Sequence, residues 1–115
     1  MTFDIRVSDI TLDSVDPDRL APFWGQLLGL ALGDRFGPYL NLEPLPGGIT
    51  LGFQRVPEDK AGKLRMHLDL RVSDLAAAVA RVVKLGGRHL RDVEELGHRW
   101  AVVADPEGNE FCLLG

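Results

Sequence analysis

Two side chains in this sequence of 115 residues have types and positions that suit chemistry, His67 and Glu110. Glu110 follows the turn sequence "DPEGN" and precedes the apolar run "FCLL", so its carboxylate either faces solvent or serves a site. His67 opens the alternating segment "HLDLRVSD". An imidazole and a carboxylate that share a hollow can work together as general acid and base. The simpler alternative is a hydrogen-bonded pair in the wall of a polar cavity.

The alternation of apolar and polar residues predicts that both side chains lie on the same face of a sheet. Successive side chains of a strand point to opposite faces, and the apolar ones must pack against helices. In the segments 67–72 and 110–114 the concave face would then carry His67, Asp69, Arg71, Glu110 and Cys112. His67 and Glu110 are therefore the candidate catalytic residues.

The neighbours of this pair also have simple structural interpretations. Asp69 and Arg71 would form an ion pair that supports the cavity wall or a dimer interface. Cys112 is more typical of a small buried hydrophobic residue than of a nucleophile, because no activating base is specified. By strand parity, Trp100 can line the cavity.

The first half of the chain offers further candidates for a ligand wall. Aromatic and aliphatic side chains around a few polar groups are typical of a small-molecule pocket. The candidate ligand-contacting residues in the whole chain are Phe36, Tyr39, Leu51, Phe53, Asp69, Trp100 and Cys112. For the four in the first half, the alternative is an ordinary hydrophobic core.

Two helices with clear start and stop signals must position these strands. The first is predicted to begin after Asp16 as N-cap, with proline in its first turn, and to end at Gly29. The second begins at Ser73 or Asp74 and ends in "LGG". Each helix follows one strand and precedes three shorter ones. The shorter strand candidates are 31–36, 38–43, 49–55, 88–92, 98–104 and 109–114.

The chain thus contains the order β-α-β-β-β twice. Module one covers about 5–55 and module two about 65–115, and the polar segment 56–63 links them. We predict an α+β fold with a mixed sheet and helices on its outer face. A chain of this length is expected to form a single domain, 1–115.

Composition narrows the class of partner. The net charge of −4 and the absence of a basic cluster argue against nucleic acid and against an anionic membrane surface. No apolar run approaches a membrane span, and the N-terminal residues lack the pattern of a signal peptide. The single cysteine fits a reducing compartment, so we expect a cytoplasmic protein.

Three segments together resemble the glyoxalase-like branch of the vicinal oxygen chelate superfamily, also called the glyoxalase/bleomycin resistance/dioxygenase superfamily. They are "DPDRLAPFWGQLLGL", "RMHLDLRVSDLAAAVARVVKLGG" and "WAVVADPEGNEFCLL". The resemblance implies paired βαβββ modules whose strands curl into a cup, commonly completed in a homodimer. Members include metal-dependent isomerases, ring-cleaving dioxygenases, thiol transferases and metal-free proteins that bind an antibiotic, so the fold does not select the function.

The resemblance also implies a metal centre, to which each module contributes a ligand from its first strand and one from its last. His67 and Glu110 match this pair in module two. In module one Asp9 matches His67, but Thr50, or Gly52 under a shift of two residues, matches Glu110 and is a poor ligand. Zn²⁺, Fe²⁺, Mn²⁺ or Ni²⁺ would suit the donors. We expect no tightly bound metal from so incomplete a set.

The resulting expectation is a small-molecule binding protein that holds a hydrophobic or aromatic metabolite or antibiotic in the cup. The alternative is a lyase, isomerase or dioxygenase that uses a divalent metal held by His67, Glu110 and Asp9. A third class is a regulatory domain whose sheet serves mainly to form a dimer.

Overall fold

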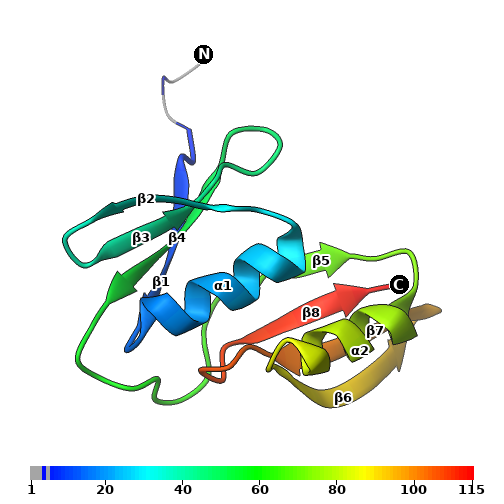
Figure 1. Cartoon of the computed structure of the whole chain (residues 1–115). Helices are drawn as coiled ribbons and strands as arrows, with labels where there is room; N and C mark the ends of the chain where they lie inside the picture. Colours follow the sequence, from blue (N-terminus) through cyan, green and yellow to red (C-terminus); the bar gives the residue numbers. More distant parts are fainter. Residues whose placement is uncertain (1–3, 5) are drawn as a thin grey trace. The chain divides into compact units, whose positions relative to one another are not determined.

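Each half of the chain builds one compact unit in the computed structural model, which describes Asp4 and residues 6–115. The division falls between Glu58 and Asp59, inside the predicted linker. Residues 57–63 of this linker are exposed. Both units have the order β-α-β-β-β (Figure 1). The predicted α+β class and the two βαβββ modules are therefore confirmed.

The first unit has a four-stranded sheet in the order β1-β4-β3-β2 (Figure 1). Strand β1 runs parallel to β4, whereas β3 is antiparallel to both β4 and β2. This mixed pattern arises because helix α1 connects β1 to the other strands. The elements are β1 (Asp9–Ser14), α1 (Pro17–Leu28), β2 (Leu32–Phe36), β3 (Tyr39–Leu42) and β4 (Thr50–Arg55).

The second unit repeats this topology in the order β5-β8-β7-β6. Strand β5 runs parallel to β8, and the pairs β7–β8 and β6–β7 are antiparallel. Strand β6 extends beyond the predicted 88–92 because its hairpin with β7 is long. The elements are β5 (Asp69–Arg71), α2 (Leu75–Lys84), β6 (Arg88–Glu95), β7 (His98–Ala104) and β8 (Glu110–Leu114).

The helix boundaries follow the predicted signals. Gly29 ends α1 in the left-handed conformation, with φ of 71°, and its N–H donates to the carbonyl oxygen of Gly25. Asp74 caps α2, since its carboxylate accepts a hydrogen bond from the N–H of Ala77. Asp16 occupies the N-cap position of α1, but its side chain makes no capping hydrogen bond.

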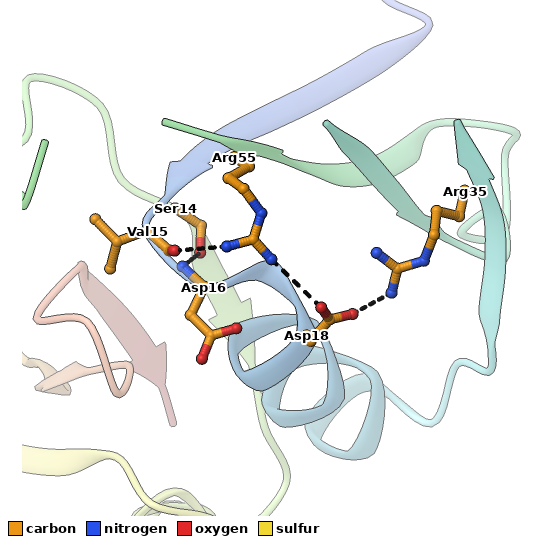
Figure 2. A network of polar contacts seen from close by, with 6 residues as sticks. All are labelled: Ser14, Val15, Asp16, Asp18, Arg35 and Arg55. Carbon is orange, nitrogen blue, oxygen red and sulfur yellow. Dashed lines mark hydrogen bonds and ion pairs between the residues drawn. The ribbon is translucent and has the colours of Figure 1, made fainter. Parts of the chain in front are cut away.

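The start of α1 is instead anchored by charged contacts with its sheet (Figure 2). Asp18 lies between two arginines and forms ion pairs with Arg35 of β2 and with Arg55 of β4. The Arg55 Nη1 also donates to the carbonyl oxygen of Val15, at 3.0 Å. These exposed contacts tie the first turn of the helix to two strands of the same unit.

Each unit buries its own apolar residues between its helix and its sheet. In the first unit, helix and sheet contribute Leu20, Ala21, Phe23, Trp24, Leu40, Leu42, Leu51 and Phe53. The core of the second unit contains Val82, Ala101, Val103, Phe111 and Leu113. Among the described residues, neither helix has the length and apolar character that crossing a membrane requires.

Candidate functional site

The strand that carries Glu110 alternates as predicted. Phe111 and Leu113 are buried, whereas Glu110 and Cys112 are partly exposed. Because α2 contacts β8, the two buried side chains belong to the core beneath the helix. Glu110 and Cys112 therefore point to the opposite face of the sheet.

That opposite face holds a pocket of about 440 Å³, lined entirely by residues of the second unit. Five side chains that the sequence placed in a common cavity line it: His67, Asp69, Trp100, Glu110 and Cys112. Arg71 lies on the same strand as Asp69, but it is exposed and is not among the lining residues. Strand parity thus located one shared hollow for the imidazole at 67 and the carboxylate at 110.

The pocket floor is organised in rows across the sheet. Asp69 of β5 pairs with Cys112 of β8, which pairs with Val102 of β7. In the next row, Leu114 of β8 pairs with Trp100 of β7. His67 and Asp69 therefore lie on the β5 side of the pocket, and Val102 and Trp100 form an apolar part of its floor on β7.

Two lining residues from β6, Arg91 and Val93, were not predicted. The pairing of β6 with β7 changes register between His89 and Arg91, which is a β-bulge at Leu90. Without this extra residue, Arg91 would lie opposite Ala101 and face the helix. The bulge moves Arg91 opposite Val102, so it points into the pocket. The alternation of apolar and polar residues in the sequence does not reveal such a change of register.

Two close polar contacts set the polarity of the pocket. The Nδ1 of His67 lies 3.0 Å from the Oδ1 of Asp69, and the Nη1 of Arg91 lies 3.7 Å from the Oε1 of Glu110. In the described part of the chain, no ion pair joins His67 directly to Glu110, and none joins Asp69 to Arg71. The sequence predicted the pairs His67–Glu110 and Asp69–Arg71. The structure instead pairs His67 with Asp69, and Glu110 with Arg91.

Cys112 is half-buried rather than fully buried, and it is the only free cysteine. Burial raises the pKa of its thiol, and the neighbouring Asp69 carboxylate raises it further through its charge and a hydrogen bond. Arg91 acts in the opposite direction with a smaller effect. The raised pKa disfavours the thiolate, which is the form that acts as a nucleophile.

The "DPEGN" segment has a structural role, which is to start β8 at Glu110. Asp105 is buried, and its Oδ1 accepts hydrogen bonds from the backbone N–H groups of Glu107 and Asn109, both at 2.9 Å. Its Oδ2 accepts from the side-chain amide of Asn109 at 2.8 Å. The carboxylate of Asp105 thus pairs with the N–H groups of the turn, and Glu110, the residue after the turn, lines the pocket.

The candidates of the first unit separate into exposed and buried residues. Phe36 is 60% exposed and Tyr39 is partly exposed, and their ring centroids lie 5.2 Å apart. Leu51 and Phe53 are 1% and 0% exposed and lie in the core with α1. Their burial does not fit the expected role in a ligand wall, and the alternative of an ordinary core describes them. Asp9 is exposed and accepts a hydrogen bond from the hydroxyl of Ser8.

The family model of the glyoxalase-like domain matches residues 9–114, nearly the whole chain. The chain belongs to the glyoxalase-like domain family. Its membership of the glyoxalase/bleomycin resistance/dioxygenase superfamily, which the sequence motifs predicted, is confirmed by this match and by the fold of related structures.

Several solved structures share the fold. A glyoxalase/bleomycin resistance protein/dioxygenase family enzyme from Burkholderia phytofirmans PsJN has a TM-score of 0.79 and 18% identity, over 93% of this chain and 95% of that one. A glyoxalase-related enzyme from Fulvimarina pelagi has a TM-score of 0.76 and 24% identity, over 95% and 86%. The oxidase ChaP-H1 has a TM-score of 0.71 and 21% identity, over 96% of this chain and 94% of that one. At these identities the similarity establishes the fold alone. No curated protein matches the chain.

The metal centre that the family implies is a poor fit to the residues of this chain. The register of β1 and β4 pairs Asp9 with Thr50. The register of β5 and β8, continued by two residues, sets His67 beside Glu110. Thr50 therefore stands where a second carboxylate would be needed, and Glu110 itself lies against Arg91. We derive no catalytic step through a metal held by His67, Glu110 and Asp9.

A different set of donors does come together. His67, Asp69 and Cys112 each offer one donor atom, and these three atoms lie within 4.8 Å of one another. Glu110 is not part of this group. The donor group that the structure brings together thus contains Asp69 and Cys112 beside His67, whereas the resemblance implied Glu110.

Proposed function

We propose that the protein binds a small aromatic or hydrophobic molecule in the pocket of its second unit, and that this binding needs no tightly bound metal. The supporting observation is that Trp100 lies among aliphatic side chains on the pocket floor, with the polar pairs His67–Asp69 and Arg91–Glu110 beside it. A volume of about 440 Å³ is in the range that small-molecule sites occupy.

The arrangement suggests how such a ligand is held. An aromatic ring would stack on the indole of Trp100 and contact Val93, Val102 and Leu114, which removes apolar surface from water. Polar substituents would reach the edge, where Arg91 offers a fork of N–H donors. The floor supplies affinity, and the charged groups orient the ligand.

Acid–base catalysis is a second candidate, since His67 and Glu110 both line this pocket. A substrate that lies between them would find an imidazole and a carboxylate in the same cavity, without a metal. His67 would take or give a proton at one end of the substrate, while Asp69 holds its ring in place. A metal-dependent lyase, isomerase or dioxygenase would instead lose its activity with a chelator.

Four further properties stay predictions. We propose that the two units form a single domain, that the protein is a homodimer in the cytoplasm, and that Phe36 and Tyr39 belong to a second apolar contact surface for a ligand. Light scattering during gel filtration tests the dimer, for which the expected mass is twice that of the chain.

A fluorescence titration tests the proposed function. Trp100 lines the pocket, whereas Trp24 is buried in the core of the first unit. A panel of aromatic carboxylic acids, phenols and polycyclic aromatics is titrated into the protein in buffer with a chelator. We expect at least one class to quench the emission of Trp100 saturably and to raise Tm by mass action. The Trp100→Phe variant should lose the quenching, and quenching that persists in this variant contradicts the proposal.

A further inference from the structure

Three different donor groups meet where β5 and β8 run parallel. His67 and Asp69 lie two residues apart and both line the pocket, and Asp69 pairs directly with Cys112 on the neighbouring strand. We propose that His67, Asp69 and Cys112 form a binding site for a thiophilic divalent cation, Zn²⁺ foremost. This site shares His67 with the pair His67 and Glu110. Its other two ligands, Asp69 and Cys112, each lie two residues further along the chain than that pair.

The donor types select the kind of ion. A nitrogen, a carboxylate oxygen and a sulfur suit Zn²⁺ or Co²⁺, whereas Mg²⁺ and Mn²⁺ prefer oxygen donors alone. The thiol of Cys112 would give up its proton to solvent when it binds the ion. The donor atoms of His67, Asp69 and Cys112 are close enough together to hold one ion.

The distances require only small movements of side chains. Two donors on one tetrahedral Zn²⁺ lie about 3.5 Å apart, given bond lengths of about 2.0–2.3 Å. The Nδ1 of His67 and the Oδ1 of Asp69 are already 3.0 Å apart, and all three donors lie within 4.8 Å. The pairing of β5 with β8 holds the backbone of Asp69 and Cys112, so rotation of side chains can close the remaining gap.

The same geometry leaves Glu110 outside the site. Its carboxylate lies 3.7 Å from the guanidinium of Arg91, which comes from β6 at the far end of the sheet from β5, and Glu110 is not among the three clustered donors. Three protein ligands leave at least one coordination position for water or for a donor atom of a bound molecule. Because His67 and Asp69 are about half-exposed, the bound ion would exchange with solution rather than stay through purification.

This inference goes beyond the proposed function and does not depend on it. The test is a titration of the metal-free full chain, without any organic ligand, by calorimetry with Zn²⁺ and by absorption with Co²⁺. Wild-type protein should bind one equivalent of Zn²⁺, and Co²⁺ should give the near-ultraviolet charge-transfer band of a cobalt–thiolate bond.

Three variants identify the ligands. Cys112→Ser should abolish the charge-transfer band, and both Cys112→Ser and Asp69→Asn should weaken Zn²⁺ binding by at least about tenfold, as expected for a lost ligand. Glu110→Gln is the matched control, since it changes a neighbouring carboxylate of the same pocket and should leave the affinity within about twofold. Circular dichroism confirms that each variant is folded, and His67→Gln provides a second test of the same site.

Opposite results overturn the proposal. Loss of binding in Glu110→Gln together with full binding in Cys112→Ser would assign the ion to His67 and Glu110. Equal affinity in all variants would mean an adventitious surface ion, and absence of binding by the wild type would exclude the site. The Trp100 titration in chelator remains interpretable in each case, so failure here and failure of the proposed function are distinguishable.

Discussion

Arg91 faces Glu110 across the pocket, with its Nη1 3.7 Å from the Oε1 of the glutamate. This relationship depends on the bulge at Leu90, which turns Arg91 away from the helix and toward the polar face. The carboxylate at the start of the last strand therefore has a cation beside it and lines a pocket. In the proposed function, Arg91 would orient a polar ligand over Trp100.

Replacement of Arg91 by methionine tests this role. The side chains of Arg91 and Glu110 are 54% and 28% exposed, so loss of this partly exposed pair should lower the free energy of unfolding by no more than about 1 kcal/mol. The affinity for a ligand with a carboxylate should fall by about tenfold or more, because a charge-assisted hydrogen bond is lost. Urea denaturation and the Trp100 titration measure the two effects. An unfolding free energy lower by several kcal/mol would mean that Arg91 is a structural residue.

The alternation of β8 makes a second prediction. Phe111→Ala should cost about 3–5 kcal/mol of stability, because it leaves a cavity in the core beneath α2. Cys112→Ala, at the next position, should cost less than about 1.5 kcal/mol, since the thiol is only half-buried. Chemical denaturation of the two variants compares them directly. Equal costs would contradict the assignment of the two faces.

The chemical reactivity of Cys112 should depend on pH. Its pKa is raised above the ordinary value by burial and by Asp69, so the thiolate forms only at more alkaline pH than in a free thiol. Alkylation by iodoacetamide should therefore be slow at pH 7 and rise with an inflection above that of a model thiol. Asp69→Asn should move the inflection to lower pH, because a negative charge next to the thiolate is removed. An inflection in the wild type below that of a model thiol would contradict this account.

The turn between β6 and β7 contains a backbone conformation that leucine disfavours. Leu96 has a φ of 52° and is 93% exposed. Asparagine tolerates this left-handed region better, so Leu96→Asn should raise the stability by about 0.5–1 kcal/mol. Leu96→Ala is the control and should give no comparable gain, since alanine disfavours the same region. Thermal unfolding measures both, and a lower Tm for Leu96→Asn would argue that the leucine side chain makes a contact worth more than the strain.

Much of the fold was predictable, because the signals that define it are local. The N-caps, the glycine stops and the alternation within each strand predicted two βαβββ modules and put His67 and Glu110 in one hollow. Pairing between strands is not local. Leu51 and Phe53 pair with Ile10 and Leu12, which share the face toward α1, and this register decides that they are core residues.

The contacts inside the site were less predictable for the same reason. The bulge at Leu90 is visible only once β6 is paired with β7, and it supplies the partner of Glu110. Glu110 lies beside Arg91, and His67 lies beside Asp69. Strand parity predicted the face on which His67 and Glu110 lie, but their contacts with Asp69 and Arg91 depend on how the strands pair.

The most direct test of the central claim is a map of amide chemical shifts during titration with an aromatic ligand identified by the Trp100 titration. The account predicts that the shifts which change cluster at residues 67–69, 91–93, 100–102 and 110–112, the strand segments that line the pocket of the second unit. Changes confined to α2 or to the first unit, with these segments unaffected at saturation, would contradict it.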